Sequence, residues 1–181
     1  ILKQIKQIEN LVNEFSDFAR MPKPLLKKNN LNEVIKENIN LISKIDSTIK
    51  IRLINQLSKD VVIKFDNEQF NRLFFNLIKN SVESIQEKVK KDSKINKNID
   101  IEIRQRNHYI NINLLDTGTG FKDKKTKDLI KPYFTTKEKG TGLGLSIVDK
   151  IISDHDGSIK FLNHKNGAKI QIVIPIKTDV S

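Results

Sequence analysis

Asn76-Leu77-Ile78-Lys79-Asn80-Ser81-Val82-Glu83 lies at the centre of the segment that decides the fold. Around it, from Asp66 to about Val89, apolar residues recur three and four positions apart, which predicts a helix with one broad apolar face. Asp66 is a good N-cap, because its carboxylate can accept from the first backbone N–H groups. Asn76 and Asn80 are four residues apart, so we expect their amides on one helix face.

Strand patterns lie on both sides of this helix. The predicted strands are 49–54, 61–65, 99–106, 109–115, 158–163 and 168–174, and the third and fourth form a hairpin. Further helices are predicted at 32–44 and 142–155, with a short one near 123–130. This mixture predicts an α+β fold, a two-layer sandwich in which helices cover one face of a mixed, mainly antiparallel sheet.

One amphipathic helix is predicted ahead of this domain, over residues 1–20. Met21-Pro22-Lys23-Pro24 ends it, because proline cannot continue a helix and restricts the residue before it. A lone helix of this length is marginal in water, so its apolar stripe needs a partner. We therefore assign residues 1–28 to a helix with a linker, and residues 29–181 to the main domain.

The composition is that of a globular protein, with 181 residues of which 37% are hydrophobic and 30% charged. No apolar run reaches the roughly 20 residues that a bilayer crossing needs, and no secretory signal pattern opens the chain. We therefore expect membrane attachment only through upstream segments. Cysteine is absent, which excludes disulfides, thiolate metal sites and cysteine nucleophiles.

The formal net charge is +11, from 33 Lys and Arg against 22 Asp and Glu. A basic chain can bind nucleic acid or an anionic membrane, but a lysine excess can also reflect biased codon usage. Because the lysines are not interleaved with aromatic residues, they match a base-stacking surface poorly, and we expect no nucleic-acid partner. A positive field would also attract a polyanionic nucleotide.

Three further clusters carry polar chemistry. Asp116-Thr117-Gly118-Thr119-Gly120-Phe121 follows a predicted strand, where a carboxylate can accept from an amino group such as that of adenine. Lys131-Pro132-Tyr133-Phe134-Thr135-Thr136-Lys137 can anchor a loop whose last lysine reaches an anion. Gly140-Thr141-Gly142-Leu143-Gly144-Leu145 opens a helix whose N-terminus favours phosphate. Each cluster alone also fits a plain turn, loop or solvated helix face.

In this order, the four clusters resemble the sequence boxes of the histidine-kinase branch of the Bergerat ATP-binding superfamily. That superfamily also holds DNA gyrase, mismatch-repair and heat-shock-chaperone ATPases. The matches are the asparagine box (Asn76 to Asn80), the first glycine box (Asp116 to Gly120), the phenylalanine box (Pro132 to Thr136) and the second glycine box (Gly140 to Gly144). The resemblance covers about residues 29–176 and implies a Bergerat fold that binds ATP and Mg²⁺.

The resemblance also implies roles for individual residues. It makes Asn80 the Mg²⁺ ligand, Asn76 a phosphate or metal-shell contact, and Asp116 the carboxylate that selects adenine. Lys137, on a lid over the phosphates, would join the two asparagines as a catalytic residue by neutralising charge. The other implied nucleotide contacts are Glu83, Gly118, Gly120, Phe121, Thr135, Thr136, Gly140, Thr141, Gly142, Leu143, Gly144 and Leu145.

Position 76 separates the branches of this superfamily. The ATPase relatives carry a glutamate there to activate water, and the amide of Asn76 cannot take a proton. This favours a kinase that transfers the γ-phosphoryl group to a histidine. None of His108, His155 and His164 lies in an acceptor motif, so we expect the acceptor upstream and a structural or solvated role for all three. A superfamily ATPase and a non-catalytic nucleotide-binding regulatory module remain alternatives.

The segment from Glu14 to Pro24 is similar to the second dimerisation helix of nitrogen-regulation type sensor kinases. This implies a dimeric four-helix bundle in which Phe15 and Phe18 are buried, a homodimeric full-length protein with a response regulator as partner, and a cytoplasmic domain anchored at the inner membrane. The alternative is a helix that packs only on its own domain. Ile130-Lys131 departs from the family's Phe-Glu, and Thr117 from a common asparagine. Both departures bear on the lid.

Overall fold

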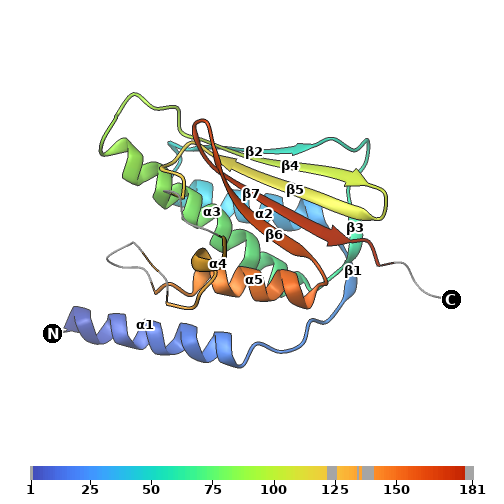
Figure 1. The fold of residues 1–181 in the computed structure, drawn as a ribbon, viewed down its shortest axis with the longest axis horizontal. Coiled ribbons are helices and arrows are strands. Elements are labelled where there is room, and N and C mark those ends of the chain that lie inside the picture. The colour runs from blue at the N-terminus through green and yellow to red at the C-terminus, as the bar shows by residue number, and fades with distance from the viewer. Residues whose placement is uncertain (1, 122–125, 134, 136–140, 178–181) are drawn as a thin grey trace.

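A five-stranded sheet forms one layer of the computed structural model, which describes residues 2–121, 126–133, 135 and 141–177 (Figure 1). The strand order is β2-β4-β5-β7-β6, with β2 parallel to β4 and all other neighbours antiparallel. The bounds are β2 Lys50–Asn55, β4 Asn98–Arg106, β5 Tyr109–Asp116, β6 Ser158–His164 and β7 Gly167–Pro175. A separate two-stranded sheet pairs β1 (Lys27–Asn30) with β3 (Val62–Phe65).

Helices form the second layer, over one face of the large sheet (Figure 1). The covering helices are α2 (Leu31–Ile45), α3 (Asn67–Val89) and α5 (Gly144–Asp154). The short α4 (Thr126–Leu129) precedes α5, and α1 (Leu2–Ala19) lies apart from the sheet. The predicted α+β sandwich is therefore confirmed, as are the predicted helices and strands; residues 123–125 of the predicted short helix lie outside the described residues, and β1 was not predicted.

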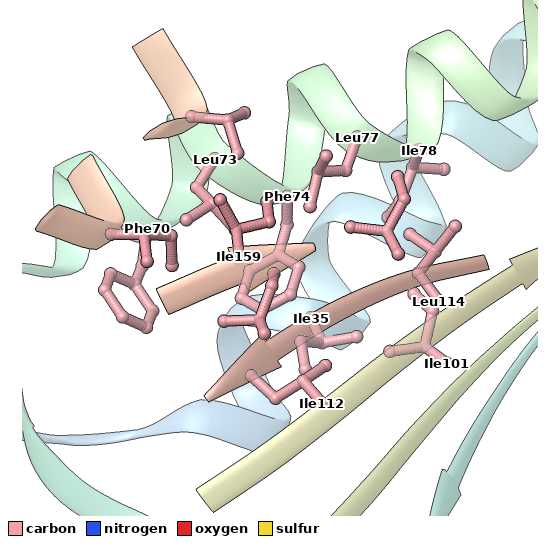
Figure 2. Packing of buried hydrophobic residues seen from close by; sticks show 14 of the residues in the cluster. Ile35, Phe70, Leu73, Phe74, Leu77, Ile78, Ile101, Ile112, Leu114 and Ile159 are labelled. Atoms are coloured by element: carbon pink, nitrogen blue, oxygen red, sulfur yellow. The ribbon is translucent and has the colours of Figure 1, made fainter. Parts of the chain in front are cut away.

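The core lies between α3 and the central strands (Figure 2). Alternate residues of β4, β5 and β7 point to the helices, which is why each strand shows the period-two burial of a half-covered sheet. On α3, Phe70, Phe74 and Leu77 meet this face. Fully burying each such side chain contributes about 1.5–3 kcal/mol. This packing fixes α3 and β5, the two elements that carry the asparagine box and Asp116.

The linker after α1 is attached to the start of α3. Asp66 caps α3 by accepting from the Gln69 backbone N–H at 3.0 Å, as its sequence position predicted, and its second oxygen accepts from Leu25 N at 2.7 Å. Gln69 Nε2 donates to the Pro22 carbonyl at 3.0 Å. β1 begins at Lys27, opposite Phe65, so the segment between α1 and α2 is held by side-chain and strand pairing.

His155 ends α5 and is one of the most buried polar residues, at 1% exposure. Its Nδ1 lies 2.7 Å from the Ile151 carbonyl, and its Nε2 accepts from the Asp66 backbone N–H at 3.1 Å. This pairing requires a neutral ring with the proton on Nδ1. Burial lowers the pKa of His155, and so the histidine is structural, as the sequence analysis expected.

Lowering the pH from 7.5 to 5.5 is expected to reduce the free energy of unfolding partly through His155. The unfolded state gains a proton near the ordinary pKa of 6.5, whereas the folded state holds its histidine neutral to a lower pH. The loss is at most ~1.4 kcal/mol per pH unit for one group. Asp66 and Asp154 favour the charged ring and Lys177 opposes it. Denaturant titrations across this range measure the slope.

The His155→Gln variant is the control for this slope. The glutamine side chain keeps a donor and an acceptor but does not titrate, so the stability of the variant is expected to vary less between pH 7.5 and 5.5. Asp46 and Asp156 have lowered pKa values, and their contributions are lost only in more acidic solution. Parallel slopes for the two proteins would contradict the assignment.

α1 presents an apolar stripe to solvent. Ile5, Ile8, Val12 and Phe15 recur three or four positions apart, and all four are exposed. At its end, Phe18 packs against the core, and the Phe15 ring stacks on Tyr133 with centroids 6.2 Å apart. None of the described helices combines the length and apolar character that a bilayer crossing requires. In the described part of the chain the stripe therefore stays exposed, apart from the contact of Phe15 with Tyr133.

Candidate functional site

The two asparagines of α3 face the first turn of α5. A Cβ placed on Gly144 would lie 3.5 Å from Asn76 Oδ1 and 3.8 Å from Asn80 Nδ2. Both asparagines are partly exposed, although α3 buries its opposite face in the core. The four-residue spacing thus places both amides on one face, as predicted, and that face meets the second glycine box.

The start of α5 is suited to an anion. Gly142 has φ +73°, a left-handed conformation that favours glycine, and Leu143 behind it is fully buried. Among the described residues no side chain caps the helix at Leu143, and Leu143 N lies 3.5 Å from Thr141 Oγ1. This turn, which lies beside the two asparagines, carries the positive end of the helix dipole, where phosphate would be favoured.

Asp116 ends β5 and is 4% exposed. Its Oδ1 accepts from Gly118 N at 2.9 Å and from Ala168 N at 3.1 Å, and its Oδ2 accepts from Ser81 Oγ at 2.9 Å. Burial raises the pKa of Asp116, while these hydrogen bonds and the charge of Lys88 act in the opposite direction. The orientation of the Asp116 carboxylate is therefore fixed by donors from α3, from β7 and from the loop after β5.

The loop after Asp116 is held close to α3. Ser84 Oγ accepts from Thr119 N at 2.9 Å, and a Cβ on Gly118 would collide with Ser84. Gly120 has φ +70°, and Phe121 N donates to Asn163 Oδ1 at 2.8 Å. The loop therefore needs glycine at 118 for a close approach and at 120 for its backbone conformation.

Six further residues were predicted as nucleotide contacts, and three of them have no described position. Thr136, Lys137 and Gly140 lie outside the described residues. Thr135 is exposed, whereas Glu83 and Leu145 are partly buried on α3 and α5. In the described part of the chain, no three His, Asp or Glu side chains gather as a metal cluster.

Two serines on α3 were missed by the sequence analysis. Ser81 binds Asp116, and Ser84 binds the Thr119 backbone. They lie one and four positions after Asn80, three apart from each other, so helix periodicity alone places them on adjoining turns. No local pattern indicates their partners, because those lie 35 residues away.

The comparison with known families decides the identity. Residues 65–178, which include α3, Asp116 and the second glycine box, match the family described as histidine kinase-, DNA gyrase B-, and HSP90-like ATPase. The chain belongs to this family. ATP is therefore the nucleotide for which this ATPase-family site is built, and the asparagines, Asp116 and the start of α5 are its candidate contacts.

Curated relatives of the chain include a nitrogen regulation protein and a sporulation kinase. The chain is 31% identical to the nitrogen regulation protein NtrY of Azorhizobium caulinodans over 179 residues, 99% of the chain and 23% of the relative. It is also 31% identical to sporulation kinase C of Bacillus subtilis, over 99% of the chain and 41% of that protein. The chain thus spans less than half the length of these relatives.

Solved family structures support the same fold. The nucleotide-free catalytic domain of histidine kinase ThkA superposes with a TM-score of 0.71 at 27% identity, over 83% of the chain and 95% of that domain. ThkA in complex with the response regulator protein TrrA superposes with a TM-score of 0.76 at 23% identity, over 99% of the chain and 50% of that protein. The two-layer family fold predicted from the sequence is thereby confirmed.

Proposed function

We propose that this chain is the ATP-binding catalytic domain of a sensor histidine kinase, preceded by one helix of the dimerisation domain. The observation that carries the proposal is Asn76, an amide that faces the first turn of α5 in a family fold. A water-activating ATPase needs a carboxylate base at this place, and an amide cannot accept a proton from water. A histidine acceptor needs no strong base, because imidazole is already a competent nucleophile.

The site residues have separate roles in phosphoryl transfer. Asp116 reads the adenine amino group, while the first turn of α5 and Lys137 neutralise the phosphates. An imidazole nitrogen attacks the γ-phosphorus, the bond to the β–γ bridging oxygen breaks, and ADP leaves. Such transfer depends mainly on positioning and charge neutralisation.

Mg²⁺ fits the residues that are present. Asn80, and Asn76 beside it, offer amide oxygens, which are hard ligands of the kind that Mg²⁺ binds. Phosphate oxygens and water would be its other ligands, because Mg²⁺ usually keeps several waters and shares substrate phosphates. When bound, it would supply charge neutralisation at the transferred phosphoryl group.

The partners follow from the same proposal. The exposed stripe of α1 fits the interior of a dimeric bundle made with a second copy, which would bury Phe15 and its neighbours. We also propose that residues 1–28 are the end of that bundle and its linker, that a response regulator receives the phosphoryl group, and that upstream segments anchor the protein at the inner membrane.

Phosphorylation in trans tests the proposal. The chain, ATP and Mg²⁺ are incubated with a separate bundle fragment of the full-length protein that carries the acceptor histidine. The expected result is phosphate on the bundle that is stable in base and labile in acid, as a phosphohistidine is. The bundle with its acceptor histidine replaced by glutamine is the control and should stay unlabelled.

Two outcomes would contradict this function. One is an unlabelled bundle together with steady release of inorganic phosphate, which would indicate a superfamily ATPase. The other is ATP binding with neither transfer nor hydrolysis, which would indicate a nucleotide-binding regulatory module. A retained label on the control bundle would show that the acceptor is a different residue.

A further inference from the structure

The hydrogen bonds that the described residues make to Asp116 leave room for one more donor. Oδ1 already accepts from the Gly118 and Ala168 backbone N–H groups, at 2.9 and 3.1 Å. Oδ2 accepts from Ser81 Oγ at 2.9 Å. A carboxylate oxygen accepts about two hydrogen bonds, so Oδ1 is filled and Oδ2 keeps one position. Any ligand amino group that Asp116 reads must therefore share Oδ2 with Ser81.

We propose that Ser81 is the positioning residue for base selection, because it aims Oδ2 of Asp116 at the amino group of the adenine ring. The proposal rests on the proposed function of the site and deepens it. Ser81 is 2% exposed and follows Asn80 directly on α3. One turn of α3 thus holds a phosphate-side amide and the residue that orients the base-reading carboxylate.

The geometry of α3 shows that this contact is specific. A serine inside a helix commonly bonds the carbonyl four residues back, but Ser81 Oγ instead reaches Asp116, 35 residues along the chain. Without the hydroxyl, Oδ2 would lose the one partner that the described residues give it, in a site where a buried carboxylate needs every donor. Burial raises the pKa of Asp116, so Ser81 also helps to keep the group ionised and accepting.

Paired nucleotide affinities test this role in the intact chain. The two probes are ATP and purine riboside triphosphate, in which hydrogen replaces the amino group of the base. The wild-type chain is expected to prefer ATP about 10-fold or more, the size of a hydrogen bond to a charged group. In Ser81→Ala the preference should fall to within about threefold, mainly through weaker ATP binding.

Two further variants separate positioning from structure. Ser81→Thr keeps the hydroxyl and is expected to restore the preference for ATP. Ser153→Ala, on the exposed side of α5, is the matched control and should bind both probes as the wild type does. Melting temperatures are recorded for all variants. Should Ser81→Ala prove unfolded, Ser81→Cys has a similar volume and a weak donor, and is expected to show an intermediate preference.

The outcomes are distinct. Full ATP preference in Ser81→Ala, or in Ser81→Cys if it replaces that variant, overturns the proposal. So does equal binding of the two probes by the wild type, although ATP binding and phosphoryl transfer would then still stand. Absence of binding of either probe to the wild type would instead overturn the proposed function of the site.

Discussion

Asp116→Asn is expected to lower ATP affinity by about 100-fold while leaving the melting temperature nearly unchanged. The amide oxygen of asparagine can take over the bonds from Gly118 N and Ala168 N, and its NH₂ group can donate to Ser81 Oγ. The fold therefore loses little. On the side facing the base, however, an acceptor becomes a donor, and it meets the amino group of adenine donor to donor.

The variant should also reverse the base preference. Inosine triphosphate carries a carbonyl where ATP carries the amino group, so it accepts from the new amide of Asp116→Asn. Equilibrium titration with ATP and with inosine triphosphate measures both changes. Asp116→Ala, which leaves two buried backbone N–H groups without an acceptor, is expected to lose ATP binding as well and some stability. Unchanged ATP affinity in Asp116→Asn would remove Asp116 from the site.

The elements that the sequence predicted are those with local causes. Asp66 can be read as a cap because its partner, Gln69, is three residues away on the same helix. The strands of the large sheet show alternation because the sheet is covered on one face only. β1 has neither signal: it reads Lys-Lys-Asn-Asn and is a strand because β3 pairs with it. Such a strand depends on tertiary context.

The candidate site also combines features that a local sequence pattern predicts with contacts that no local pattern predicts. The spacing of Asn76 and Asn80 predicted one shared face, and the structure places that face at Gly144. The contacts that hold Asp116, such as its hydrogen bond with Ser81, join distant segments and have no local pattern. The resemblance identified the polar residues at which a nucleotide would be bound. It did not identify Ser81, Ser84 and Gly167, which hold Asp116 and the loop after it in place.

Gly167 is constrained by a contact with a distant segment of the chain. We expect Gly167→Ala to lower the free energy of unfolding by about 2–3 kcal/mol. A Cβ there would collide with the Asp116 carbonyl and lie 2.7 Å from Gly118 N and 2.8 Å from Asp116 Oδ1. The backbone atoms among these cannot swing away as a side chain does. The β5–β7 pairing and the hydrogen bonds of Asp116 hold them.

The substitution should also weaken ATP binding, because room for the methyl group can be made only by moving Asp116 and the first glycine box. Denaturant midpoints and nucleotide titrations on the same samples measure the two effects. Gly144→Ala is the matched comparison for stability: its Cβ meets nothing nearer than 3.5 Å, and alanine favours a helix. If the two variants unfold at the same denaturant concentration, the close packing of Gly167 on Asp116 does not exist, and the rigid placement of the Asp116 carboxylate loses its support.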